Sequence, residues 1–115
     1  MPPKRNPLNL NSLQLKTLTL LQELARIAGK PMPEADEPGG LAITALPNPH
    51  GDHFHLGEAV VAARDATGLH NPAVWAALER KGLIRPKLPE AVILTALGQE
   101  YDTGLRDAIL HSAGH

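Results

Sequence analysis

Three histidines and an aspartate lie within six residues of one another, in the segment PHGDHFH. They are His50, Asp52, His53 and His55. Imidazole nitrogens and carboxylate oxygens bind transition metals such as Zn²⁺, Ni²⁺ and Cu²⁺. If HFHL is a strand, its alternation places His53 and His55 on one face. These two side chains could then hold one metal ion together with His50 or Asp52 from the preceding turn.

Two other interpretations of this histidine cluster stay open. Neighbouring imidazoles titrate near neutral pH, so the cluster could sense protons. Alternatively, the histidines are plain surface residues of a turn, because turns collect polar residues for reasons of backbone geometry.

The rest of the chain offers little that suggests catalysis. Ser12 and Ser112 are its only serines, and neither lies in a G-x-S-x-G motif. The sequence contains no glycine-rich phosphate-binding loop. It also has no cysteine, which excludes disulfides, thiolate zinc sites and cysteine nucleophiles. We therefore expect no enzyme, and Zn²⁺ or Ni²⁺ at the histidine cluster is the only cofactor considered.

Composition indicates one small globular domain. A length of 115 residues suits a single domain, and 3% aromatic residues require a core of Leu, Ala, Val and Ile. The net charge of −1 argues against a partner bound mainly by electrostatics. We expect a flexible arm over residues 1–10 and the domain over 11–115, with an acidic loop at 29–40. The absence of a signal segment or apolar span predicts a cytoplasmic protein.

The first predicted helix follows the arm and is unusually apolar. Asn11 or Ser12 can cap it, and Gln14 suits a capping box with Asn11. Gly29 ends it. Its large apolar side chains lie on more than one face, so either the domain surrounds the helix or a second subunit covers part of it. These residues are Leu13, Leu15, Leu18, Leu20, Leu21, Leu24 and Ile27.

A β-hairpin is expected next, followed by two helices. Segments 41–46 and 53–56 predict the two paired strands, with Phe54 and Leu56 facing the core. Residues 57–67 predict a helix, and Gly68 a left-handed turn residue.

The second half of the chain continues with a helix, two strands and a final helix. Asn71 and Pro72 suit the start of a helix over 71–81, which Gly82 helps to end. The segments LIRP and AVILT predict two strands joined by a turn at 87–90. A last helix is expected over 97–111, with Tyr101, Leu105 and Ile109 on one face.

The order of elements between residues 56 and 101 resembles that of winged helix-turn-helix proteins, in particular small bacterial MarR-like regulators. ALERKGLI closes a helix and runs directly into a strand, and VILTALGQE joins a strand to a helix. The resemblance implies an α+β winged helix-turn-helix fold. An extra N-terminal helix, a β-hairpin before the helix-turn-helix and a C-terminal helix would complete it.

The resemblance also implies which residues would contact double-stranded DNA. The helix over 71–81 would enter the major groove, with His70 and Asn71 near the bases. Trp75 could contact thymine methyl groups, belong to the core, or anchor a protein partner. A cationic rim would contact phosphates, although the same residues could be an ordinary solvated face. The rim consists of Arg64, Arg80, Lys81, Arg85 and Lys87.

The leading functional hypothesis is therefore a DNA-binding transcriptional regulator that dimerises through its first and last helices. The near-neutral charge and the few polar residues of the 71–81 helix support an alternative, a winged-helix protein-interaction module without specific DNA binding. A metal-responsive regulator that uses His50, His53 and His55 is a further alternative.

Overall fold

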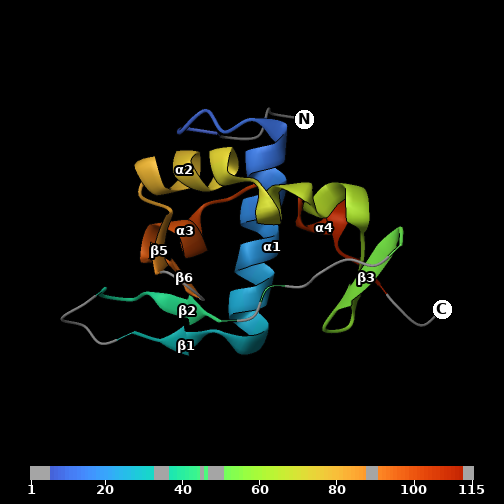
Figure 1. Ribbon diagram of the computed structural model, residues 1–115, viewed down its shortest axis with the longest axis horizontal. Helices are drawn as coiled ribbons and strands as arrows, with labels where there is room; N and C mark the ends of the chain where they lie inside the picture. The colour runs from blue at the N-terminus through green and yellow to red at the C-terminus, as the bar shows by residue number, and fades with distance from the viewer. Residues whose placement is uncertain (1–5, 33–36, 45, 47–50, 88–90, 113–115) are drawn as a thin grey trace.

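One central helix organises the structure. The computed structural model describes residues 6–32, 37–44, 46, 51–87 and 91–112. Helix α1 (Ser12–Ala28) runs through the middle of the molecule (Figure 1). The predicted capping box is confirmed: Gln14 N donates to Asn11 Oδ1 over 2.8 Å, and Asn11 N donates to Gln14 Oε1 over 2.9 Å.

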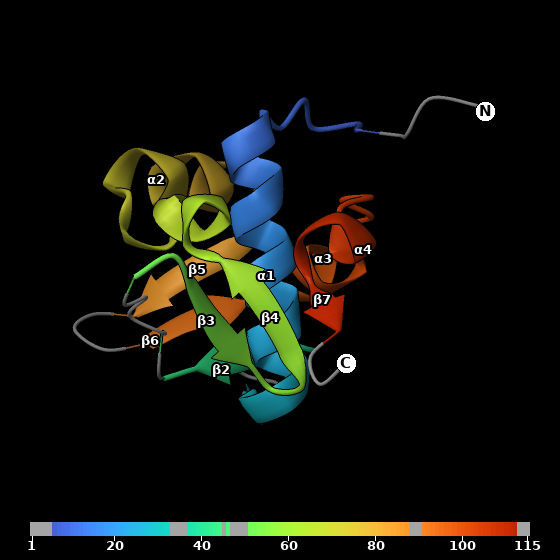
Figure 2. The same cartoon turned by 90° about the vertical axis from the view of Figure 1, so that its right-hand side faces the viewer.

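Other helices cover α1 on two sides. The 3-10 helix η1 and helix α2 pack on one side, and α3 and α4 lie on the other (Figure 2). All five residues from 17 to 21 are buried, so this part of the helix meets protein around its whole circumference. The bounds are η1 (Ala63–His70), α2 (Pro72–Arg80), α3 (Ala96–Glu100) and α4 (Arg106–Ile109). Most of the apolar excess of α1 is therefore covered by its own chain, although Ile27 near its end is 43% exposed.

Two antiparallel sheets accompany the helices in the described residues. The four-stranded sheet has the order β1-β2-β6-β5, and the three-stranded sheet has the order β3-β4-β7. The fold is therefore α+β, as expected. The strands are β1 (Lys30–Pro31), β2 (Leu41–Ile43), β3 (His53–Leu56), β4 (Ala59–Ala62), β5 (Ile84–Lys87), β6 (Ala91–Leu94) and β7 (His111–Ser112). The predicted pairing of β5 with β6 is confirmed.

The predicted hairpin between segments 41–46 and 53–56 is wrong. Strand β2 pairs with β1 and β6, and β3 pairs with β4. The turn between β3 and β4 contains only two residues, and Gly57 adopts a φ of +60°, which suits the first position of such a turn. The β-branched residues Val60 and Val61 favour a strand where a helix was predicted.

Only the second half of the helix predicted over 57–67 is helical, as part of η1. Gly68 lies inside η1 and does not adopt the predicted left-handed conformation. Its role is close packing, because a Cβ atom at this position would lie 1.9 Å from Thr17 Oγ1 of α1. The absence of a side chain at Gly68 thus lets η1 approach the central helix.

The continuous last helix predicted over 97–111 is also wrong. The chain forms the short helices α3 and α4, with a turn between them. Gly104 in this turn has a φ of +71°, and its N–H donates to the Asp102 side chain over 3.0 Å. Of the three apolar positions predicted to share a face, Tyr101 and Ile109 are buried and Leu105 is only half-buried.

Residues 6–10 of the predicted arm are held against the domain. The Tyr101 hydroxyl donates to Asn6 Oδ1 over 2.5 Å and accepts from Leu8 N over 3.2 Å. Lys81 Nζ at the end of α2 donates to Leu8 O over 2.5 Å. Leu10 is 4% exposed and belongs to the core. No helix among the described residues is long and apolar enough to cross a membrane.

A buried carboxylate links α1 to α4. Glu23 is 2% exposed and forms ion pairs with Arg26 of α1 and Arg106 of α4. The hydrogen bond from Arg26 lowers the pKa of Glu23 most strongly, burial opposes it, and Arg106 lowers it further, to about 2. Both arginines are more than half exposed, so one buried anion orients two surface cations.

This cluster predicts a specific loss of stability in acid. Because the folded-state pKa of Glu23 lies below the ordinary value of 4.5, the charged carboxylate stabilises the fold above about pH 4.5. That contribution is lost as the pH falls from there towards 2. The Glu23→Gln variant should lose about 2 to 3 kcal/mol of unfolding free energy at pH 7. Urea denaturation between pH 2 and pH 7 measures both effects, and the variant should show a shallower pH dependence. The exposed Glu79→Gln serves as control, and equal losses in both variants would contradict the assignment.

The packing of η1 on α1 gives a second prediction. Gly68→Ala should cost about 1 to 3 kcal/mol of unfolding free energy, because its Cβ atom would overlap the Thr17 hydroxyl. Thr17→Ala removes that hydroxyl, so the double variant should be more stable than the sum of the single effects predicts. Denaturant unfolding of the four proteins in this cycle provides the test. Additive effects would show that Gly68 is not limited by Thr17.

Candidate functional site

The surface formed by η1 and α2 contains most of the residues predicted to contact DNA. Asn71 caps α2, since its Oδ1 accepts from Ala73 N over 3.0 Å, and Pro72 occupies the first helical turn. Val74, Ala77 and Leu78 face inward and are buried. The outer face of α2 therefore presents small and charged side chains. Its exposed residues are Pro72, Ala73, Ala76, Glu79 and Arg80.

Trp75 is partly buried at the edge of this surface. It packs against the hydrophobic core, and its indole N–H donates to Leu69 O over 2.9 Å. This hydrogen bond links α2 to the end of η1, where His70 is exposed. Of the three predicted roles for Trp75, a structural contribution to the core fits its surroundings best.

Two of the predicted rim cations are engaged within the chain. Lys81 holds the backbone of the N-terminal segment at Leu8. Arg85 on β5 forms an ion pair with Glu37, whose side chain is 15% exposed, over 2.6 Å. The Lys87 side chain lies outside the described residues. Neither Lys81 nor Arg85 is thus an unengaged cation available to a phosphate.

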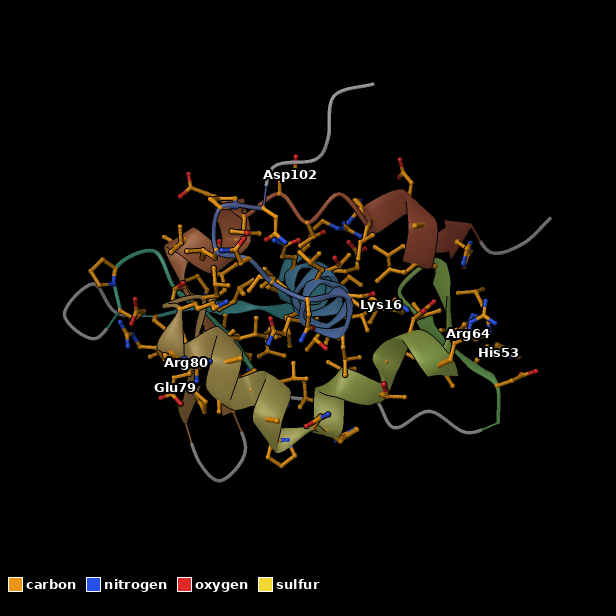
Figure 3. All side chains as sticks on the ribbon, turned by 90° about the horizontal axis from the view of Figure 1, so that it is seen from above. Lys16, His53, Arg64, Glu79, Arg80 and Asp102 are labelled. Atoms are coloured by element: carbon orange, nitrogen blue, oxygen red, sulfur yellow. The ribbon has the colours of Figure 1, made fainter. Side chains whose placement is uncertain are left out.

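Arg64 and Arg80 differ from these cations. Both are exposed, and neither forms an ion pair with a carboxylate in the part of the chain that the structure describes. Arg64 lies near the start of η1, and Arg80 is the last residue of α2. Figure 3 shows them at opposite ends of the η1–α2 unit. They are the members of the predicted rim best placed to meet a ligand.

The histidine cluster lies on a separate surface, the sheet of β3, β4 and β7. Phe54 and Leu56 are buried and His53 and His55 are exposed, as the alternation predicted. The two imidazole rings lie 5.7 Å apart between centroids. His53 Nδ1 lies 2.9 Å from Asp52 Oδ1, and this hydrogen bond lowers the pKa of Asp52.

The metal site predicted from His53 and His55 with His50 or Asp52 can be described only in part. His50 lies outside the described residues. Within the described ranges, no group of three or more His, Asp or Glu residues is arranged to hold a metal ion.

His111, which the sequence placed at the end of the predicted last helix, instead lies in strand β7. It pairs with Val60 of β4, which also pairs with His55, so the register aligns the two histidines across the sheet. The signal was weak, because β7 has only two residues in its described form. Comparison with family models, curated proteins and solved structures found no match for the chain.

Proposed function

We propose that this chain is a winged helix-turn-helix protein that binds double-stranded DNA through α2 and acts as a small transcriptional regulator. The order α1, β2, η1, α2, β5, β6 and α3 supports this fold, with the β3–β4 hairpin inserted between β2 and η1. Strand β2 pairs with β6, which joins the segment before the helix pair to the β5–β6 hairpin after it. In this interpretation η1 and α2 are the helix-turn-helix, and β5 and β6 are the wing strands.

The observation that carries the proposal is the uncovered outer face of α2, flanked by two exposed arginines. Ala73 and Ala76 have small side chains, which would let the helix approach the floor of the major groove closely. Arg64 and Arg80 lie at the two ends of the unit and would contact phosphates on either side of the groove. The wing would contribute less, because Arg85 is already paired with Glu37.

Polar groups near the start of α2 would supply sequence preference. In helix-turn-helix proteins the first residues of the second helix contact the base edges. Here the first helical residues, Pro72 and Ala73, have no polar side chain, so the polar groups nearest the start of α2 are those of His70 and Asn71, which immediately precede it. The Asn71 carbonyl oxygen is used in capping, but its amide N–H groups remain able to donate to a base. Two such residues would give modest specificity on top of phosphate binding.

The protein-interaction alternative rests on a different observation. Four polar atoms of the residues predicted to contact DNA are already hydrogen-bonded within the chain. They are Asn71 Oδ1, Trp75 Nε1, Lys81 Nζ and Arg85 Nε. The first part of the exposed α2 face, formed by Pro72, Ala73 and Ala76, is small and apolar, as a contact with another protein would favour. In this case α2 would dock on a protein partner. The dimer predicted through the first and last helices has less apolar surface to use, since Leu18, Leu20, Leu21 and Leu24 of α1 are buried and Ile27 is the large apolar residue of this helix that is exposed.

The phosphate contacts can be tested one arginine at a time. Arg64→Ala and Arg80→Ala should each weaken binding to duplexes of any sequence. Each should also reduce the slope of log affinity against log salt by about 1, because one fewer counterion is released. Fluorescence anisotropy between about 50 and 200 mM salt measures this slope. Lys30→Ala, an exposed cation on β1, is the matched control. If wild-type protein binds no duplex even at the lowest salt, the interaction-module alternative replaces the proposal.

The base-proximal role of Asn71 can be separated from its capping role. Aspartate caps a helix about as well as asparagine, so Asn71→Asp should leave the unfolding free energy within about 0.5 kcal/mol. The added negative charge should nevertheless weaken DNA binding by at least about tenfold, within the range of one lost base contact. Asn71→Ser retains a cap without the charge and controls for the loss of the amide. Unchanged affinity in Asn71→Asp would place the DNA elsewhere on the protein.

A further inference from the structure

We propose that His53 and His55 form a two-imidazole chelate for a divalent transition-metal ion, and that Asp52 orients His53 without binding the metal. The proposal is independent of DNA binding. It differs from a four-ligand site in assigning the metal to two neighbouring side chains of one strand. Water molecules would complete the coordination, because the site is exposed.

The backbone fixes both histidines on the outer face of β3. Phe54 and Leu56, which alternate with them, are 9% and 5% exposed and anchor the strand in the core. The pairings His53 with Ala62 and His55 with Val60 fix the register. A shift of one residue would bury the histidines and expose Phe54 and Leu56, so the register is strongly determined.

The rings are already close to the spacing that a shared ion requires. With metal–nitrogen bonds of about 2.0 to 2.1 Å, two imidazoles at a tetrahedral angle have centroids roughly 5 to 5.5 Å apart. The observed separation of 5.7 Å is therefore within about 1 Å of a chelating arrangement. The rings meet edge to face, with an interplanar angle of 72°, so a chelate would form by rotation of the two side chains about their own bonds.

Asp52 supplies the feature that distinguishes this pair from ordinary surface histidines. Its carboxylate lies 2.9 Å from His53 Nδ1, an arrangement that favours a proton on Nδ1 and leaves Nε2 free to bind a metal. The Asp52 backbone is itself held, because its carbonyl oxygen accepts from Ala63 N over 2.9 Å. The His53 imidazole is thus oriented by Asp52 on the side opposite the nitrogen that would bind the metal.

The chemistry of the donors selects the class of metal. Neutral imidazoles suit Cu²⁺, Ni²⁺ and Zn²⁺, whereas Mg²⁺ and Ca²⁺ require oxygen ligands. Cu²⁺ should bind most tightly of these ions, as the general order of divalent affinities predicts.

Calorimetric titration of untagged protein with Cu²⁺ and Ni²⁺ tests the chelate, and electron paramagnetic resonance of the Cu²⁺ complex identifies nitrogen ligands. One ion should bind per chain with two imidazole nitrogens. His53→Ala and His55→Ala should each lose at least about tenfold in affinity, and Asp52→Asn about tenfold. His70→Ala, which removes an exposed histidine at the far end of η1, should leave the affinity unchanged.

Three outcomes would overturn the proposal. Affinity that survives in His53→Ala or His55→Ala would place the ion elsewhere. A loss in His70→Ala as large as in those variants would indicate nonspecific binding to surface histidines. A copper spectrum without two nitrogen ligands would exclude the chelate. Circular dichroism of each variant separates these results from misfolding.

Discussion

The burial of the middle of α1, where residues 17–21 are all buried, is the constraint on which the rest of the structure depends. A helix buried on all sides must satisfy every polar group that it carries, because an unsatisfied buried group costs free energy. Thr17 and Thr19 donate back to carbonyl oxygens of their own helix, and Thr19 also reaches Thr103. Glu23 obtains its partners from Arg26 and from Arg106, far along the chain. Within the described residues no buried side-chain nitrogen or oxygen lacks a hydrogen-bond partner.

The same constraint requires the helices around α1 to pack closely against it. A side chain at Gly68 would keep η1 from approaching α1, because its Cβ atom would lie 1.9 Å from Thr17 Oγ1. Lys16 and Asp65 join the same two elements by an ion pair over 3.0 Å. The hydrogen bond from Trp75 to Leu69 and the buried residues Val74 and Leu78 then hold α2 beside η1. The exposed face proposed to meet DNA is thus positioned by contacts that begin at the central helix.

The sequence was sufficient to predict the elements that carry a recognisable local pattern, such as capping residues at a helix start. Asn11 with Gln14 and Asn71 with Pro72 identified two helix starts, and the alternation of HFHL identified the outward histidines. Strand pairing was harder to predict. Strand β2 pairs with β6, about fifty residues further along the chain, and nothing in the segment LAI specifies that partner. The same limit applies to the candidate site. The sequence gives no sign of which cations are free of carboxylate partners. Only the tertiary contacts separate Arg64 and Arg80 from Lys81 and Arg85, which are bonded within the chain.

That separation bears directly on the choice between DNA and protein partners. A net charge of −1 leaves little general attraction for a polyanion, so DNA binding would have to rest on local charge. Because Lys81 and Arg85 are engaged inside the chain, the local charge reduces to Arg64 and Arg80 at the two ends of the η1–α2 unit. Two phosphate contacts give a small dependence on salt, well below that of proteins with six or more. A weak salt dependence combined with measurable DNA affinity would therefore fit this surface, whereas a steep one would require cations outside it.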